Sequence, residues 1–202
     1  MIHYNVHPVD PQIRILEIVS DILTNKNGIC IYPTDTVYGM GACIKNPKAV
    51  DKICTIIKKD KKRLFSFICS DFSQVSEYVK INNYNFKLMK HYLPGPYTFI
   101  LPSTNYVPKK VSPKRRTVGI RIPDCKVTTS LIKIIGQPIA NTSLSVSSDK
   151  QGDPNMFERE IKDQVDVILD VGKLNEPSGS TIVDLTGDIP VLIREGKGKW
   201  YG

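Results

Sequence analysis

The chain has 202 residues, of which 41% are hydrophobic, and its 28 Lys and Arg outnumber 20 Asp and Glu, giving a formal net charge of +8 at pH 7. This length and composition favour a single domain over residues 1–202, and the cationic excess favours phosphates, carboxylates or nucleic acid as ligands. The five cysteines are odd in number and lack C-x-x-C spacing, no apolar run approaches about 18 residues, and no secretory leader opens the chain, so we expect a cytoplasmic protein without a metal site or a membrane span.

Helices and strands alternate through the first 145 residues. After an N-terminal strand or arm, Asp10-Pro11 has the chemistry of a helix start, and apolar residues recur at helical spacing up to Asn27-Gly28. The run GICIYP (28–33) predicts a short buried strand, and Asn46-Pro47 opens a second helix. The same criteria predict further strands at 63–69, 97–102, 117–123 and 138–143, and helices at 72–79, 84–93 and 126–136.

The end of the chain is expected to be strand-rich. Apolar runs at 165–171, 180–185 and 190–195 follow one another at short spacing, which predicts antiparallel strands. Added to the alternating first part, they predict an α/β fold with a twisted mixed β-sheet and flanking helices.

The segment YPTDTVYGMG (32–41) directly follows the first buried strand. Loops at the carboxyl ends of strands are where open α/β sheets bind ligands. Thr34, Thr36 and Tyr38 offer hydroxyl groups there, and the glycines let a ligand approach the backbone. The alternative is a strand-to-loop turn whose hydroxyls satisfy the backbone.

Other polar groups interrupt apolar strands. Arg121 and Arg194 each lie in an otherwise apolar run, where a buried charge needs a carboxylate, a phosphate or an anionic ligand. The run 58–63 holds five of the cations and is either a solvated helix end or a source of Lys59 and Arg63 for a cleft. The segment ANTSLS forms a second hydroxyl-rich strand end. These features together are what an anion-binding cleft requires.

No nucleophile with a neighbouring base is evident, because the three histidines are isolated in the sequence. A reaction that depends on positioning and charge stabilisation, such as nucleotidyl transfer, fits that absence.

Taken together, YPTDTVYGMG, LPGPYTFIL, TVGIRIP, PIANTS and TIVDLTG occur in an order and spacing that resemble the YrdC domain family over roughly residues 8–196. HPVDPQ and REGKG are similar to its YciO branch. The resemblance implies a YrdC-like sheet around a large basic cavity. It also implies a threonylcarbamoyl-AMP synthase, a nucleotidyltransferase that joins L-threonine, bicarbonate and ATP and releases pyrophosphate.

In that family the product serves a threonylcarbamoyl modification of tRNA, so tRNA and an enzyme that transfers the threonylcarbamoyl group to it are implied partners. ATP is then a substrate, and the sequence does not specify whether Mg²⁺ accompanies it. Carried over residue by residue, the resemblance implies a threonine side made of Thr34, Thr36, Tyr38, Arg121 and Arg194. It implies an ATP and bicarbonate side made of Lys59, Arg63, Thr142, Ser143 and Ser145, with no catalytic residue assigned.

The chain departs from the family pattern at two places. Ile57-Lys58-Lys59 replaces the usual K-x-R, and Ser145 replaces the asparagine of S-x-N. These changes remove a cation and a planar guanidinium from the nucleotide side. The alternative is therefore a YciO-type paralogue with weak or altered activity that binds nucleotide or double-stranded RNA, and a regulatory anion sensor without turnover is a third hypothesis.

Overall fold

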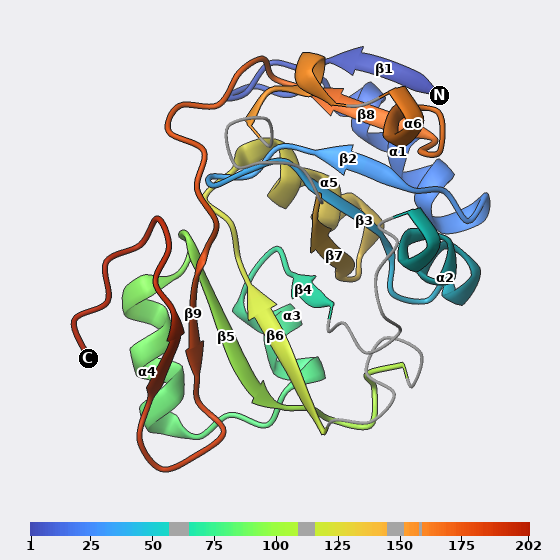
Figure 1. Cartoon of the computed structure of the whole chain (residues 1–202). Coiled ribbons are helices and arrows are strands. Elements are labelled where there is room, and N and C mark those ends of the chain that lie inside the picture. The colour runs from blue at the N-terminus through green and yellow to red at the C-terminus, as the bar shows by residue number, and fades with distance from the viewer. Residues whose placement is uncertain (57–64, 109–115, 145–151, 158) are drawn as a thin grey trace.

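The computed structural model describes residues 1–56, 65–108, 116–144, 152–157 and 159–202. Within these residues, ten strands form one twisted mixed sheet in the order β1-β8-β2-β3-β7-β4-β6-β5-β9-β10 (Figure 1). The strands are β1 (Ile2–Asn5), β2 (Cys30–Tyr32), β3 (Gly39–Cys43), β4 (Ser66–Ile68), β5 (Tyr97–Pro102), β6 (Thr117–Arg121), β7 (Ile139–Ser143), β8 (Val167–Asp170), β9 (Thr181–Asp184) and β10 (Val191–Arg194). The helices are α1 (Ile13–Asn25), α2 (Pro47–Ile56), α3 (Phe72–Tyr78), α4 (Asn83–Tyr92), α5 (Lys126–Ile135) and α6 (Arg159–Lys162), with a 3-10 turn η2 (Pro154–Met156).

The first helix shows how the sequence sets local structure. α1 buries Leu16, Val19 and Leu23 on one side, as their helical spacing predicts. Its end depends on Gly28, whose N–H donates to the carbonyl of Ile22 at 2.9 Å. A Cβ at residue 28 would lie 2.4 Å from Ile22 Cγ2, so the chain needs a glycine to leave the helix at this point.

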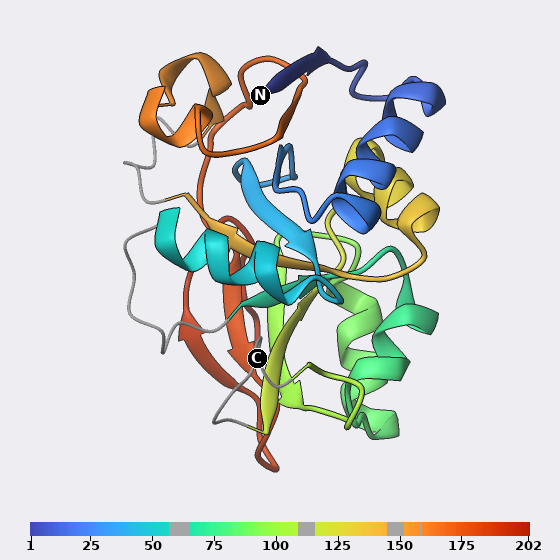
Figure 2. The ribbon, with the colours of Figure 1, turned by 90° about the vertical axis from the view of Figure 1, so that its right-hand side faces the viewer.

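Two hydrophobic cores lie on opposite faces of the sheet. α1 and α5 cover the face that carries Cys30 and Tyr32, and Figure 2 shows these two helices side by side. α2, α3 and α4 contribute to the other core, which contains Met40 and Phe67. Because side chains alternate along a strand, neighbouring residues of β2, β3 and β7 belong to different faces.

The expected α/β fold is confirmed, with two corrections to the strand predictions. The small-residue run GMGAC forms β3, a strand that the sequence analysis did not predict. The prediction that the last three strands are antiparallel neighbours is wrong for β8, which lies between β1 and β2 and is parallel to both. β9 and β10 are antiparallel to each other, but β9 pairs in parallel with β5. Residues 171–180 therefore cross from one half of the sheet to the other.

Across the described ranges, no helix is both long enough and apolar enough to span a bilayer.

Candidate functional site

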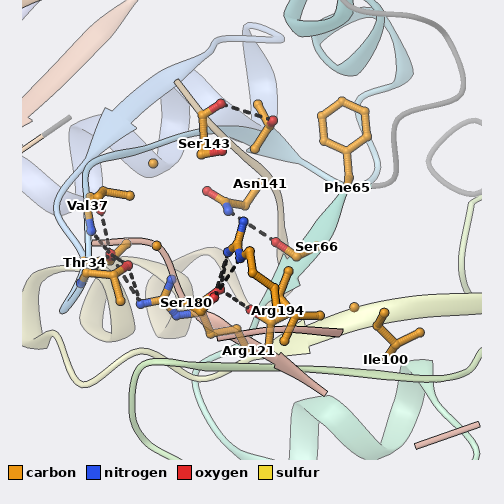
Figure 3. Close-up of a pocket in the computed structure, with 17 residues that line it drawn as sticks. Thr34, Val37, Phe65, Ser66, Ile100, Arg121, Asn141, Ser143, Ser180 and Arg194 are labelled. Carbon is orange, nitrogen blue, oxygen red and sulfur yellow. Dashed lines mark hydrogen bonds between the residues drawn. The ribbon is translucent and has the colours of Figure 1, made fainter. Parts of the chain in front are cut away.

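A cavity of about 420 Å³ opens on the sheet face to which Tyr32 belongs. Its walls come from β3, β4, β5, β6, β7, β9 and β10 and from the segment 34–37 that follows β2 (Figure 3). Segments far apart in the sequence thus meet at one concavity.

The floor of this cavity is hollow because the residues that face it are small. Ser66 on β4 pairs with Asn141 on β7 and with Gly119 on β6. Gly39 on β3 pairs with Ser143 on β7. Larger side chains at these cross-strand positions would fill the space above the sheet.

Arg121 forms the inner wall. Its side chain is only 6% exposed, and it forms an ion pair with Asp35, whose side chain is 12% exposed. The same guanidinium nitrogen donates to Thr36 Oγ1 at 2.8 Å and to Thr34 Oγ1 at 3.4 Å. The buried charge of Arg121 is therefore paired with a carboxylate, one of the three kinds of partner that the sequence leads us to expect.

Thr34 also organises the turn itself. Its hydroxyl donates to the carbonyl of Val37 at 2.6 Å and accepts the backbone N–H groups of Thr36 and Val37 at 3.1 and 3.2 Å. The turn interpretation of this motif is thus correct for Thr34, and the same hydroxyl faces the cavity.

Two buried polar atoms of this ion pair have no hydrogen-bond partner among the described residues. They are Asp35 Oδ2 and Arg121 Nε. Neither atom is accessible to solvent, so both lie beneath the surface of the cavity wall, and the groups that Arg121 presents to the cavity are the others of its side chain.

Arg194 forms the outer wall on β10. Its Nε and one terminal nitrogen donate to the carbonyl of Ser180 at 3.2 and 2.7 Å. The Ser180 hydroxyl in turn lies 2.9 Å from Thr98 Oγ1. A Cβ at Gly179 would lie 3.1 Å from the guanidinium, so glycine lets Arg194 lie against the backbone here.

The GKGKW segment near the C-terminus is hydrogen-bonded to β9 at this outer wall. Thr181 accepts the N–H of Gly196 at 3.0 Å and donates to the carbonyl of Gly198. A Cβ at Gly196 would lie 2.3 Å from the carbonyl oxygen of Gly179. Trp200 packs on Tyr92 with ring centroids 4.8 Å apart. The glycines of this segment therefore serve close backbone packing.

β7 supplies the third wall. Asn141 and Ser143 share the face that looks into the cavity. Thr142 also borders the cavity, but it pairs with Met40, so its side chain alternates to the other face.

Tyr38 lies away from this set. It precedes β3 in register with Met40, and its buried ring packs edge-on against Phe157. Its hydroxyl donates to the carbonyl of Gly172 at 2.8 Å and accepts the N–H of Val171 at 3.0 Å. Burial raises the pKa of Tyr38. Strand alternation thus directs Tyr38 into the core opposite the cavity.

Of the other expected site residues, Thr34, Thr36, Arg121, Ser143 and Arg194 meet at the cavity. Lys59, Arg63 and Ser145 lie outside the described residues, so their role stays a prediction. The cavity is also lined by residues that are not among the expected site residues, namely Ser66, Thr98, Gly119, Asn141 and Ser180. Their signal is the short polar or glycine side chain that interrupts an apolar strand.

A second cavity of about 500 Å³ lies on the other side of Thr34. Pro8, Val9, the start of α5 and Leu174 line it. The 33–36 turn thus stands between two cavities. Within the described ranges, no three His, Cys, Asp or Glu side chains gather closely enough to hold a metal ion.

The family model Sua5_yciO_yrdC, described as telomere recombination, matches residues 23–196. The uncharacterized protein YciO of Escherichia coli is 36% identical over 96% of this chain and 95% of its own length. The crystal structure of E. coli YciO superimposes with a TM-score of 0.91, covering 98% of each chain.

Two relatives carry an activity or a ligand in their names. The threonylcarbamoyl-AMP synthase of Bacillus subtilis is 33% identical over 93% of this chain, which spans 54% of that protein. The crystal structure of P. abyssi Sua5 complexed with L-threonine has a TM-score of 0.87 at 26% identity, and the match covers 97% of this chain and 58% of that one.

Proposed function

Because the chain belongs to the Sua5/YciO/YrdC family, we propose that it is a threonylcarbamoyl-AMP synthase-like nucleotidyltransferase acting on L-threonine, bicarbonate and ATP. In the proposed reaction, the amine of L-threonine adds to bicarbonate with loss of water. An oxygen of the resulting carbamate attacks the α-phosphorus of ATP, and pyrophosphate leaves. Positioning and charge stabilisation carry such a reaction, which needs no side-chain nucleophile.

The convergence of two arginines and two threonines on one cavity is the observation that carries this proposal. A free amino acid bears a carboxylate and an ammonium group close together. Arg121 and Arg194 line the cavity from its inner and outer walls, and a guanidinium group is suited to bind a carboxylate. Thr34 and Thr36 add hydroxyl-bearing side chains to the same cavity. The L-threonine bound by P. abyssi Sua5 supports the choice of amino acid.

We place the nucleotide toward Ser143 and the backbone of Thr142. Ser143 supplies a hydroxyl at the end of the strand, and Lys59, Arg63 and Ser145 are predicted to complete this side. The tRNA and the transferring enzyme remain predicted partners, and cytoplasmic location remains an expectation. The RNA-binding alternative also stays a prediction, because the charged run 58–63 on which it rests lies outside the described residues.

The test is to incubate the protein with ATP, bicarbonate and L-threonine and to measure pyrophosphate together with threonylcarbamoyl-AMP. We expect both products in equal amounts, and neither when bicarbonate or threonine is omitted. Replacing L-threonine by L-valine, which has the same shape without the hydroxyl, should lower the rate. ATP turnover that is independent of the amino acid would contradict the proposal.

A further inference from the structure

Asn141 is held in the cavity wall by two side chains from neighbouring strands. Its Oδ1 accepts a hydrogen bond from the hydroxyl of Tyr32 at 2.7 Å. Its Nδ2 donates to Ser66 Oγ at 3.2 Å, as Figure 3 shows. Asn141 and Ser66 are half-buried, whereas Tyr32 is fully buried. An amide whose oxygen and nitrogen are both hydrogen-bonded presents its remaining hydrogen-bonding groups in a fixed direction.

Two glycines of the 32–41 motif make this arrangement possible. A Cβ at Gly39 would lie 2.4 Å from Asn141 Oδ1 and 3.2 Å from the Tyr32 ring. A Cβ at Gly41 would lie 3.0 Å from the Tyr32 hydroxyl. The absence of side chains on β3 therefore lets the Tyr32 ring reach across that strand from β2 to β7. These glycines accommodate a neighbouring side chain, a role distinct from the ligand approach that their sequence suggests.

Sheet register places Asn141 and Ser66 between the two ends of the cavity. They face each other in one cross-strand row. In the adjacent row on one side, Ile68 pairs with Arg121. On the other side, Ser143 lies two residues further along β7. A group that bridges an amino acid at Arg121 and a nucleotide at Ser143 must pass over this row.

Both residues keep donor capacity. Asn141 Nδ2 has two N–H groups and uses one on Ser66. Ser66 Oγ accepts that bond, so its own O–H can donate to a ligand. Burial raises the pKa of Tyr32 well above its usual value, so its hydroxyl stays a neutral donor and keeps Asn141 Oδ1 occupied.

We propose that Asn141 and Ser66 form a neutral donor pair for the carboxyl oxygen derived from bicarbonate, with Tyr32 as the residue that positions the amide. This inference rests on the proposed function, since that function defines what joins the two ends. The bridging carboxyl group bears the oxygen that attacks phosphorus. Neutral donors can orient that group. The full positive charge of an arginine would make the attacking oxygen less nucleophilic.

The experiment measures steady-state kinetics and bicarbonate binding on the same full-length variants. Asn141→Ala and Ser66→Ala should each raise KM for bicarbonate roughly tenfold and leave KM for L-threonine within about twofold. Tyr32→Phe should raise KM for bicarbonate by about threefold, again without moving KM for L-threonine. Asn83→Ala and Tyr84→Phe are matched controls on the exposed side of α4 and should change neither constant. Urea unfolding identifies any variant that fails to fold.

Binding without turnover is followed by broadening of the ¹³C resonance of labelled bicarbonate in the presence of L-threonine. Broadening by the wild type that is lost in Asn141→Ala and Ser66→Ala supports the donor pair even if the protein forms no adenylate, in which case the proposed function alone fails. Adenylate formation with an unchanged KM for bicarbonate in both folded variants would overturn the donor pair and leave the proposed function standing. A wild type that neither turns over nor broadens the resonance would overturn both.

Discussion

Arg121 and Arg194 line the same cavity from its inner and outer walls, yet the fold holds them in different ways. Arg121 is buried and is held by the side chains of one turn, above all the carboxylate of Asp35. Arg194 lies on β10, a strand whose residues are all exposed, and is held by the backbone carbonyl of Ser180. Removing one partner of a buried ion pair destabilises the fold, because the other charge is left buried and unpaired. An exposed charge that is hydrogen-bonded to the backbone can be removed at little cost to stability.

The inner wall should show the largest effect. Arg121→Met leaves the Asp35 carboxylate buried without its cation, and we expect a loss of about 3–5 kcal/mol in the free energy of unfolding, measured by urea denaturation. The double variant Arg121→Met with Asp35→Asn should be clearly more stable than the single variant, because no buried charge remains. A single variant that loses less than about 1 kcal/mol would show that Asp35 is solvated when its partner is removed.

The outer wall should depend on packing. Gly196→Ala places a Cβ against the carbonyl oxygen of Gly179, where neither backbone can move far, and overpacking of this kind costs about 1–3 kcal/mol. Gly187→Ala is the matched control, because the nearest atom to a Cβ there is 4.0 Å away. Thermal unfolding of the two variants measures the difference. Equal stability would mean that the C-terminal segment can move away from β9.

Arg194 itself separates binding from stability. Arg194→Ala should weaken L-threonine binding about tenfold by calorimetry, equivalent to about 1.4 kcal/mol, because one charge-assisted hydrogen bond is lost. The free energy of unfolding should change by less than about 1 kcal/mol. Arg14→Ala removes an exposed arginine of α1 and should leave threonine affinity unchanged. If Arg194→Ala instead unfolds the protein as readily as Arg121→Met, the contrast between the two walls is wrong.

The sequence predicts much of this fold because most elements carry their own periodicity. The strands that contain Arg121 and Arg194 are found where apolar runs predict them. The run GMGAC was missed because glycine and alanine have low strand propensity, although their small size is what β3 needs beside Tyr32. Because β3 is not predicted, the strand alternation that directs Tyr38 away from the cavity cannot be predicted from the sequence either.

Long-range pairing explains the other gaps. Nothing local indicates that β8 joins β1 and β2, because residues 171–180 carry the chain across the sheet. The hydrogen bond between Tyr32 and Asn141 likewise joins residues that are 109 positions apart in the sequence. Polar residues in the strands mark which side chains are candidates, and only the register shows which of them face one another.

Asp71 is a charged residue outside the cavity that can be compared with Arg194, because both side chains are hydrogen-bonded to backbone groups. It caps α3 and accepts the N–H of Gln74 at 3.0 Å. That bond lowers the pKa of Asp71 below its usual value of about 3.9. The pKa of Asp71 is therefore lower in the folded protein than in the unfolded chain. The charged carboxylate stabilises the folded protein above about pH 4, and this stabilisation is lost as the pH falls through the pKa of the folded protein.

We therefore expect Asp71→Ala to cost about 1 kcal/mol at pH 7 by urea denaturation and progressively less below pH 4, where the wild type loses the same interaction. Asp71→Asn keeps a cap acceptor that does not titrate, so its stability should stay close to that of the wild type at pH 7 and its difference from Asp71→Ala should persist in acid. The effect is small because the carboxylate is exposed and its partner is uncharged, in contrast to Asp35. A cost at pH 7 that reaches the value expected for Arg121→Met would show that exposure and partner charge do not set the size of these effects.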